Sequence, residues 1–311
     1  MNKINTGASI KVNGTLVESQ GKGQKSEIKV TKIIVLGECD MNSYPIQPKK
    51  HSLEFLRENA HLRVRTNTFS SIMRVRSNLS FAIHKYFKEN GFFYVNTPII
   101  TGSDAEGAGE MFKVTTLELN KSSLNKKSEI DYNQDFFGKE TNLTVSGQLE
   151  AESLAMGLGK VYTFGPTFRA ENSNTTRHAS EFWMIEPEMA YCDLIGDMDL
   201  AEEMIKYLVN DILDNCEEDL ELFGKFVDKE LLERLQSVSS KPFKRISYTE
   251  AIKILEKSDI KFEYPVEWGV NLQTEHERFL TEDHFKSPVT VHDYPKSIKP
   301  FYMRVNDDDN T

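Results

Sequence analysis

The segment between residues 161 and 191 constrains the fold most, because two strand-like runs flank a short polar loop. The runs are Val161–Phe168 and Glu181–Tyr191, and the loop spans residues 172–176. Alternation in the second run places four side chains on one face, namely Phe182, Met184, Glu186 and Glu188. The pattern predicts two sheet strands near the middle of the chain.

Helical patterns lie on both sides of these strands. Apolar residues recur at helical spacing from Ile72 to Phe87, and Asn90-Gly91 supplies a left-handed stop. A second helix is expected over Asp199–Cys216, and Ser247-x-x-Glu250 reads as a capping box. The chain is therefore expected to be an α+β protein, with an antiparallel sheet flanked by helices.

The two ends of the chain contain further strand patterns. Residues Ile10–Leu36 predict a hairpin whose second run should be buried, which favours the last part of a larger barrel or sandwich. Residues 37–66 read as a linker, and residues 143–145, 289–291 and 301–305 as strands. Because the 301–305 strand runs into turn residues, we expect truncation at both ends.

Composition excludes several classes of protein. The 311 residues include 39% hydrophobic and 28% charged residues, and the net charge of −10 argues against a wholly nucleic-acid-binding surface. A basic stripe between Lys49 and Arg76 could meet phosphates or be a solvated surface. The three cysteines are scattered and no apolar run is long enough for a membrane span, so we expect a cytoplasmic protein without membrane contact.

Three residues around the polar loop suit a bent nucleotide. Arg169 could grip an α-phosphate, Glu171 could accept from an adenine amino group, and Phe182 could stack on the ring. Strand alternation is expected to place Arg169 and Glu171 on one face. A salt-bridged hairpin with one core aromatic residue is the alternative reading.

The F-R-A-E sequence, the loop and the following R-H-x-x-E-F resemble the second signature motif of the class II aminoacyl-tRNA synthetases. Within that class, four segments are similar to asparaginyl-tRNA synthetases rather than aspartyl ones. They are Glu181–Glu188 (E-F-W-M-I-E-P-E), Thr144–Leu149 (T-V-S-G-Q-L), and the segments Tyr44–Gln47 and His51–Arg57.

This resemblance implies two sets of site residues. The residues expected to bind ATP are Arg169, Glu171, Arg177, His178 and Phe182, with Arg169 also catalytic. Those expected to bind the amino acid are Glu106, Ser146, Gln148 and Glu186. Aspartate enzymes carry a lysine where this chain has Ala151, so Glu186 is expected to accept from an asparagine amide and repel aspartate.

The resemblance also implies an activity. ATP and Mg²⁺ would support adenylation of asparagine, the product would be transferred to tRNA(Asn), and the enzyme would be a homodimer. The implied domains are a partial OB-type anticodon-binding barrel (1–38), a linker (39–67) and a catalytic domain (68–311) that lacks the third motif. The magnesium ligands are not identified, and the chain by itself is expected to lack part of the active site.

Three other functions are consistent with parts of the sequence. A non-catalytic synthetase paralogue could act as an RNA-binding or regulatory dimer, and a missing third motif favours it. An enzyme of the same fold could make an amide by adenylating a carboxylate, without requiring tRNA. A single-strand-binding barrel is disfavoured because the hairpin alone offers little surface.

Overall fold

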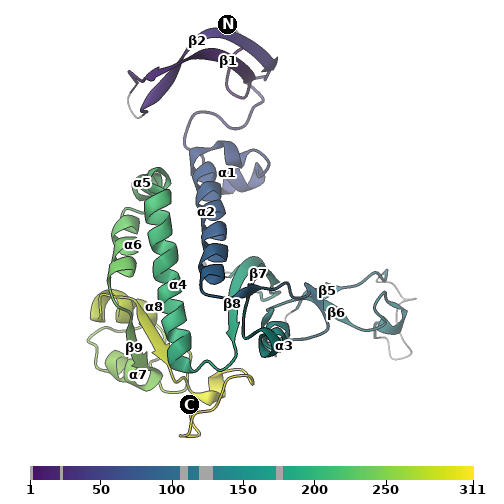
Figure 1. Cartoon of the computed structure of the whole chain (residues 1–311), viewed down its shortest axis with the longest axis vertical. Coiled ribbons are helices and arrows are strands. Elements are labelled where there is room, and N and C mark those ends of the chain that lie inside the picture. The colour runs from purple at the N-terminus through teal and green to yellow at the C-terminus, as the bar shows by residue number, and fades with distance from the viewer. Residues whose placement is uncertain (1–2, 22–23, 106–110, 119–128, 173–177) are drawn as a thin grey trace. The chain divides into compact units, whose positions relative to one another are not determined.

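The computed structural model describes residues 3–21, 24–105, 111–118, 129–172 and 178–311 (Figure 1). The chain divides into two compact units, one made of Met1–Ser77 and Cys216–Lys229 and the other of Asn78–Asn215 and Glu230–Thr311. Domain boundaries after residues 38 and 67 therefore stay a prediction.

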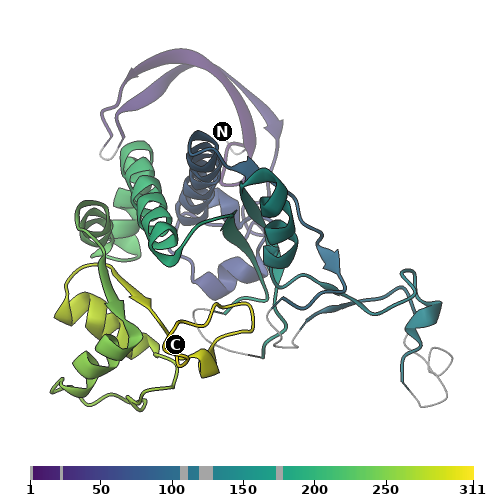
Figure 2. The ribbon, with the colours of Figure 1, turned by 60° about the horizontal axis from the view of Figure 1, so that its bottom comes forward.

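The first unit contains the predicted N-terminal hairpin. Strands β1 (Ser9–Glu18) and β2 (Ser26–Gly37) pair antiparallel as a long curved ribbon (Figure 2), so the hairpin is confirmed. Within the described residues its apolar side chains are not covered as expected, since Leu16 is 70% and Leu36 65% exposed. The barrel stays a prediction, because this sheet has two strands.

Two helices complete the first unit. Helix α1 (Leu53–Glu58) begins where the Ser52 hydroxyl accepts from the Phe55 amide, inside the segment expected to be a linker. Helix α5 (Glu217–Phe226) carries Asp219, and the Arg74 guanidinium donates to this carboxylate and lowers its pKa. A member of the basic stripe is thus neutralised within the protein.

The core of the second unit forms between two helices and the central sheet. Helix α2 (Asn67–Glu89), in which the boundary between the units falls, confirms the helix expected from Ile72 onward. The sheet has the order β3-β7-β8, with β7 and β8 antiparallel as predicted and β3 parallel to β7. Phe87 of α2 stacks on Tyr162 of β7 with ring centroids 4.3 Å apart. The bounds are β3 Phe93–Tyr94, β7 Lys160–Phe168, β8 Glu181–Met189 and α4 Leu194–Asn215.

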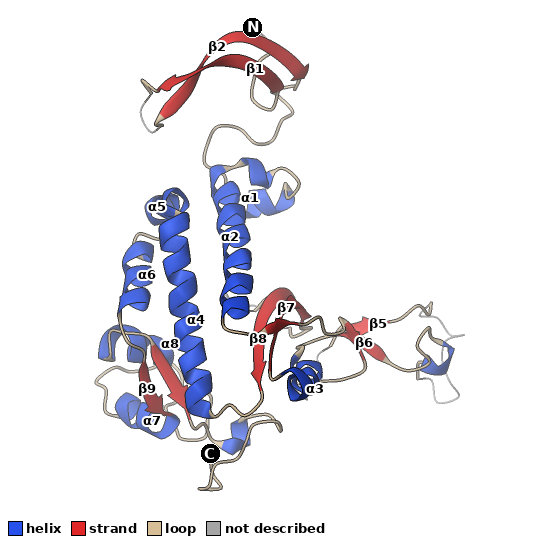
Figure 3. Ribbon diagram, viewed as in Figure 1, coloured by secondary structure: helices blue, strands red, loops and turns tan. Residues whose placement is uncertain are grey.

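A second sheet of the same unit precedes helix α3 (Figure 3). Its antiparallel order is β4-β6-β5, with β4 at Ile100–Thr101, β5 at Lys113–Val114 and β6 at Thr141–Leu143. The strand expected at 143–145 ends earlier, because the Thr144 hydroxyl donates to the Ser146 carbonyl and accepts from its amide. Helix α3 (Gln148–Leu158) then follows and packs against β7 and β8.

The remaining elements build a smaller core around Leu255 and Leu280. Strands β9 and β10 pair in parallel, and the Ser247–Glu250 capping box is confirmed at the start of α7. The bounds are α6 Leu231–Ser240, β9 Lys244–Ser247, α7 Tyr248–Glu256, α8 Thr274–Arg278 with a π-helical turn at Phe279–His284, and β10 Val289–His292.

Two of the expected element boundaries are wrong. Helix α4 begins at Leu194 rather than Asp199, because the Asp193 carboxylate accepts from the Gly196 amide and caps the helix earlier. Residues 301–305 form a turn and irregular backbone rather than a strand. The Met303 amide donates to the Pro300 carbonyl at 3.1 Å, which turns the chain there.

We expect Phe87→Ala to lower the free energy of unfolding by about 3–5 kcal/mol, because it removes a fully buried ring from the main core. Phe136→Ala is the matched control, since Phe136 lies in the same unit and is 76% exposed. Urea unfolding of both variants measures the difference. Equal losses in the two variants would contradict this account of the core.

Candidate functional site

The Glu186 carboxylate is the point at which three segments of the second unit meet. Its Oε1 accepts from the Ser146 hydroxyl at 2.5 Å, and its Oε2 accepts from the Thr163 hydroxyl at 2.7 Å. The Gly147 amide lies 3.2 Å from both oxygens. Strand β8, strand β7 and the turn before α3 therefore hold one carboxylate between them.

The turn before α3 requires a glycine at position 147. A Cβ atom there would lie 2.5 Å from the Thr97 hydroxyl oxygen, 3.2 Å from the Thr163 methyl and 3.3 Å from Glu186 Oε2. These distances are shorter than normal van der Waals contacts. The backbone can approach the carboxylate this closely only because no side chain stands between them.

The two other residues of this turn lie differently. Ser146 is buried, and its hydroxyl also accepts from the Gln148 amide at 3.1 Å. The Gln148 side chain donates to Glu152 at 3.0 Å, one turn further along α3. Ser146 is thus a direct neighbour of Glu186, whereas the Gln148 amide group is directed along the helix.

Arg169 and Phe182 lie together, as a nucleotide site would require. The Arg169 guanidinium carbon lies 5.4 Å from the centre of the Phe182 ring. One guanidinium nitrogen donates to the Val145 carbonyl at 3.4 Å and lies 3.8 Å from the Met184 sulfur. A cation and an aromatic face are therefore adjacent at the loop end of the β7–β8 hairpin.

The expected strand position of Arg169 and Glu171 is wrong, because β7 ends at Phe168. Glu171 instead faces His178 across the loop, with Oε2 and Nε2 3.6 Å apart and both side chains partly exposed. A common pocket for Arg169, Glu171 and Phe182 stays a prediction. The structure's described residues do not include Glu106 or Arg177, so the expectations for these two lie outside it.

Glu188 lies on the same face of β8 as Glu186 but in a different environment. Burial, together with the nearby carboxylates of Glu152, Glu186 and Asp197, raises the pKa of Glu188 to about 7. Asp197 is itself affected, since burial raises its pKa. The surroundings of Glu188 and Asp197 therefore disfavour their charged forms.

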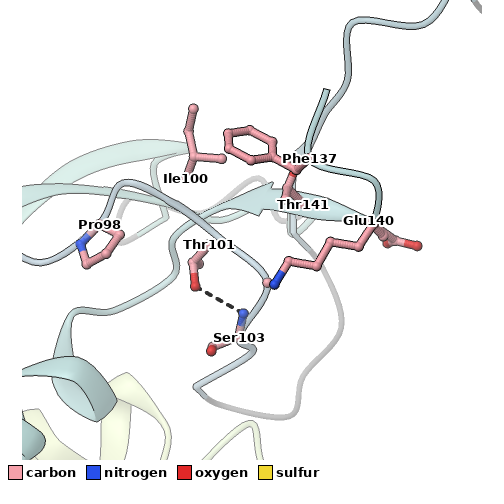
Figure 4. A pocket seen from close by; sticks show the side chains of 9 residues that line it. Pro98, Ile100, Thr101, Ser103, Phe137, Glu140 and Thr141 are labelled. Carbon is pink, nitrogen blue, oxygen red and sulfur yellow. Dashed lines mark hydrogen bonds between the residues drawn. The ribbon is translucent and has the colours of Figure 1, made fainter. Parts of the chain in front are cut away.

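A cavity of about 430 Å³ lies at the second sheet, and Figure 4 shows Phe137 beside Ile100 at its edge. The Thr101 hydroxyl accepts from the Ser103 amide at 3.0 Å within it. Its lining residues come from 98–103, 137 and 139–141, so it does not include Arg169 or Phe182. The cavity is thus distinct from the nucleotide site expected from the sequence.

In the part of the chain that the structure describes, no group of three His, Cys, Asp or Glu side chains could hold a metal ion. The described helices likewise include none that is long and apolar enough to cross a membrane.

Comparison with known proteins gives consistent matches. The family model for class II tRNA synthetases (D, K and N) matches residues 52–311. The chain is 61% identical over 308 residues to the asparagine–tRNA ligase of Nitratidesulfovibrio vulgaris (strain Hildenborough), covering 99% of this chain and 67% of that protein. The ligase of Cytophaga hutchinsonii is 60% identical, with 99% and 66% covered.

A solved structure gives a similar match. It is the crystal structure of Pyrococcus horikoshii asparaginyl-tRNA synthetase complexed with asparaginyl-adenylate, with a TM-score of 0.81 and 33% identity. The match covers 99% of this chain and 64% of that one. The chain therefore has the class II synthetase fold and spans about two thirds of the length of the relatives it matches.

We expect Gly147→Ala to lower the free energy of unfolding by about 1–3 kcal/mol, because the new methyl group would overlap Thr97 and Glu186. The control is Gly157→Ala, at a glycine within α3 that has no atom within 4 Å of an added Cβ. The free energy of unfolding of the control should rise by about 0.5–1 kcal/mol, because alanine has a higher helix propensity than glycine. Urea unfolding measures both changes, and a neutral effect at position 147 would refute the close contact.

We expect Glu188→Gln to raise the melting temperature at about pH 8 but not at about pH 5. Because the folded-state pKa of Glu188 is raised to about 7, its contribution to stability falls as pH rises from the ordinary carboxyl range to about 7. The glutamine side chain of the variant does not ionise, so its contribution to stability does not fall in this way. Glu181→Gln, at the exposed start of β8, is the control and should show no such pH-dependent gain in thermal unfolding.

Proposed function

The chain belongs to the class II tRNA synthetases of the D, K and N group, and we propose that it supplies ATP and amino-acid sites for an asparagine–tRNA ligase. The observation that carries this proposal is the 61% identity to a curated asparagine–tRNA ligase over 99% of the chain. The fold supports the proposal independently, through the similarity to an asparaginyl-tRNA synthetase holding asparaginyl-adenylate.

The proposed amino-acid site centres on Glu186. A carboxylate accepts hydrogen bonds and does not donate them, so it pairs with the NH₂ group of asparagine and repels the second carboxylate of aspartate. Ala151 is fully buried beside Ala155 and Val161, so this position of α3 brings no cation to the site. A buried polar group that only the correct substrate satisfies can discriminate by about 10⁴-fold.

The proposed nucleotide site centres on Arg169 and Phe182. The adenine ring would stack on Phe182, and the Arg169 guanidinium would neutralise charge at the α-phosphate. Glu171, Arg177 and His178 complete the set, with His178 beside Glu171 across the loop. Stacking and charge neutralisation would thus come from neighbouring residues at the loop end of one hairpin.

The proposed reaction proceeds in two steps. A carboxylate oxygen of asparagine attacks the α-phosphorus of ATP, the bond to the bridging oxygen breaks, and pyrophosphate leaves. A ribose hydroxyl of tRNA(Asn) then attacks the acyl carbon, loses its proton, and releases AMP. The protein positions the reactants and stabilises the charge at the α-phosphate.

Magnesium is expected from the family, but the described residues do not offer a site for it. The proposal further includes tRNA(Asn) as the nucleic-acid partner, a homodimer as the assembly and the cytoplasm as the location. The names of the bacterial relatives support the first of these.

We expect Glu186→Gln to raise the KM for asparagine by about tenfold to a hundredfold, with little change in the KM for ATP. The amide removes the negative charge and replaces one accepting oxygen with an NH₂ donor, which weakens the hydrogen bond to the substrate NH₂ group. ATP–pyrophosphate exchange measures both constants, with asparagine and aspartate compared, in this chain and in a version extended to the length of its relatives. Phe182→Ala is the converse control and should raise the KM for ATP instead.

Three results would overturn this proposal. If Glu186→Gln raised the KM values for asparagine and ATP equally, the Glu186 carboxylate would have no specific role in amino-acid recognition. Exchange that depends on aspartate rather than asparagine would contradict the substrate, and absence of exchange in both versions of the chain would contradict the activity.

A further inference from the structure

The hydroxyl of Thr163 is a neighbour of Glu186 that no sequence motif identified. Thr163 lies directly opposite Glu186 in the β7–β8 register. Its side chain is buried, with 4% exposed, and its hydroxyl donates to Glu186 Oε2 at 2.7 Å. A buried hydrogen bond to a charged group is among the stronger ones in proteins.

The donors around Glu186 leave little of its accepting capacity unused. A carboxylate offers about four acceptor positions, two on each oxygen. Ser146 donates to one oxygen, Thr163 donates to the other, and the Gly147 amide is shared between the two. The carboxylate is therefore fixed in rotation and retains room for roughly one further donor.

The rotamer of Thr163 determines where its hydroxyl lies, and a β-branched side chain has few allowed rotamers. In the observed rotamer the hydroxyl donates to Glu186 Oε2. The methyl group lies on the side of Gly147, 3.2 Å from the position that a Cβ would take there.

We propose that Thr163 is a positioning residue for amino-acid specificity, which holds Glu186 so that its remaining acceptor position meets the substrate amide. This inference rests on the proposed function, since it assumes that Glu186 receives the asparagine NH₂ group. Thr163 acts through Glu186 and does not contact the substrate. Loss of its hydroxyl lets the carboxylate rotate, which weakens asparagine binding without improving contacts with aspartate.

The test replaces Thr163 with valine, which keeps the shape and removes the hydroxyl. We expect the KM for asparagine in ATP–pyrophosphate exchange to rise by about tenfold to a hundredfold, since the lost bond is to a charged group. The KM for ATP should stay within about twofold. The preference for asparagine over aspartate should fall by the same factor as asparagine binding.

Two further variants separate positioning from general destabilisation. Thr163→Ser keeps the hydroxyl and should restore most of the asparagine affinity. Thr141→Val removes another buried hydroxyl, that of Thr141 in β6, which donates to the Val114 carbonyl of β5 at 3.0 Å. This variant should leave the KM for asparagine unchanged. Circular dichroism confirms that each variant is folded.

The outcomes distinguish this inference from the function on which it rests. If the unsubstituted protein, at either length, activates no asparagine, the proposed function fails. If it does activate asparagine and Thr163→Val binds asparagine normally, the inference alone is overturned. The inference would also be overturned if Thr163→Val and Thr163→Ser raised the KM for asparagine equally. It would likewise be overturned if Thr163→Val raised the KM values for asparagine and ATP equally.

Discussion

The hydrogen bonds of a single partly buried carboxylate depend on the correct assembly of three separate segments in this protein. Glu186 comes from β8, Thr163 from β7 and Ser146 from the turn before α3, and their side chains share hydrogen bonds. A carboxylate taken out of water is costly unless donors replace the lost solvent. Placing these donors correctly requires the hairpin register, the end of β6 and the start of α3 to be correct together.

Much of the fold could be predicted from periodicity and capping residues, because these signals are local. The β7–β8 hairpin, helix α2 and the capping box at Ser247 follow from residues close together in sequence. The expected boundaries were wrong where a polar side chain formed a hydrogen bond with the backbone and so moved the end of a helix or strand. Asp193 began α4 early, and the bonds between Thr144 and Ser146 ended β6 early. Propensity alone does not indicate which polar residue will bond to the backbone.

The candidate site was less predictable, because its contacts join residues that are far apart in sequence. Motif resemblance indicated Arg169, Phe182, Ser146 and Glu186. In the structure Arg169 lies beside Phe182, and Ser146 lies beside Glu186. Alternation put Arg169 on a strand that had already ended, since it assumes that the strand continues. Thr163 went unnoticed because an isolated threonine in a strand is ordinary, and only pairing with Glu186 gives it a role.

The register of the β7–β8 hairpin links the fold to the site. Thr163 pairs with Glu186, and Phe164 pairs with Ile185. A slip of one residue would place the Glu186 carboxylate beside an aromatic ring and would turn the side chains of one strand to the opposite face. The main core opposes such a slip, because Ile185 and Met189 of β8 pack against the cluster that contains Phe87, Tyr162 and Phe164. The packing of these aromatic residues therefore stabilises the arrangement of the polar groups around Glu186.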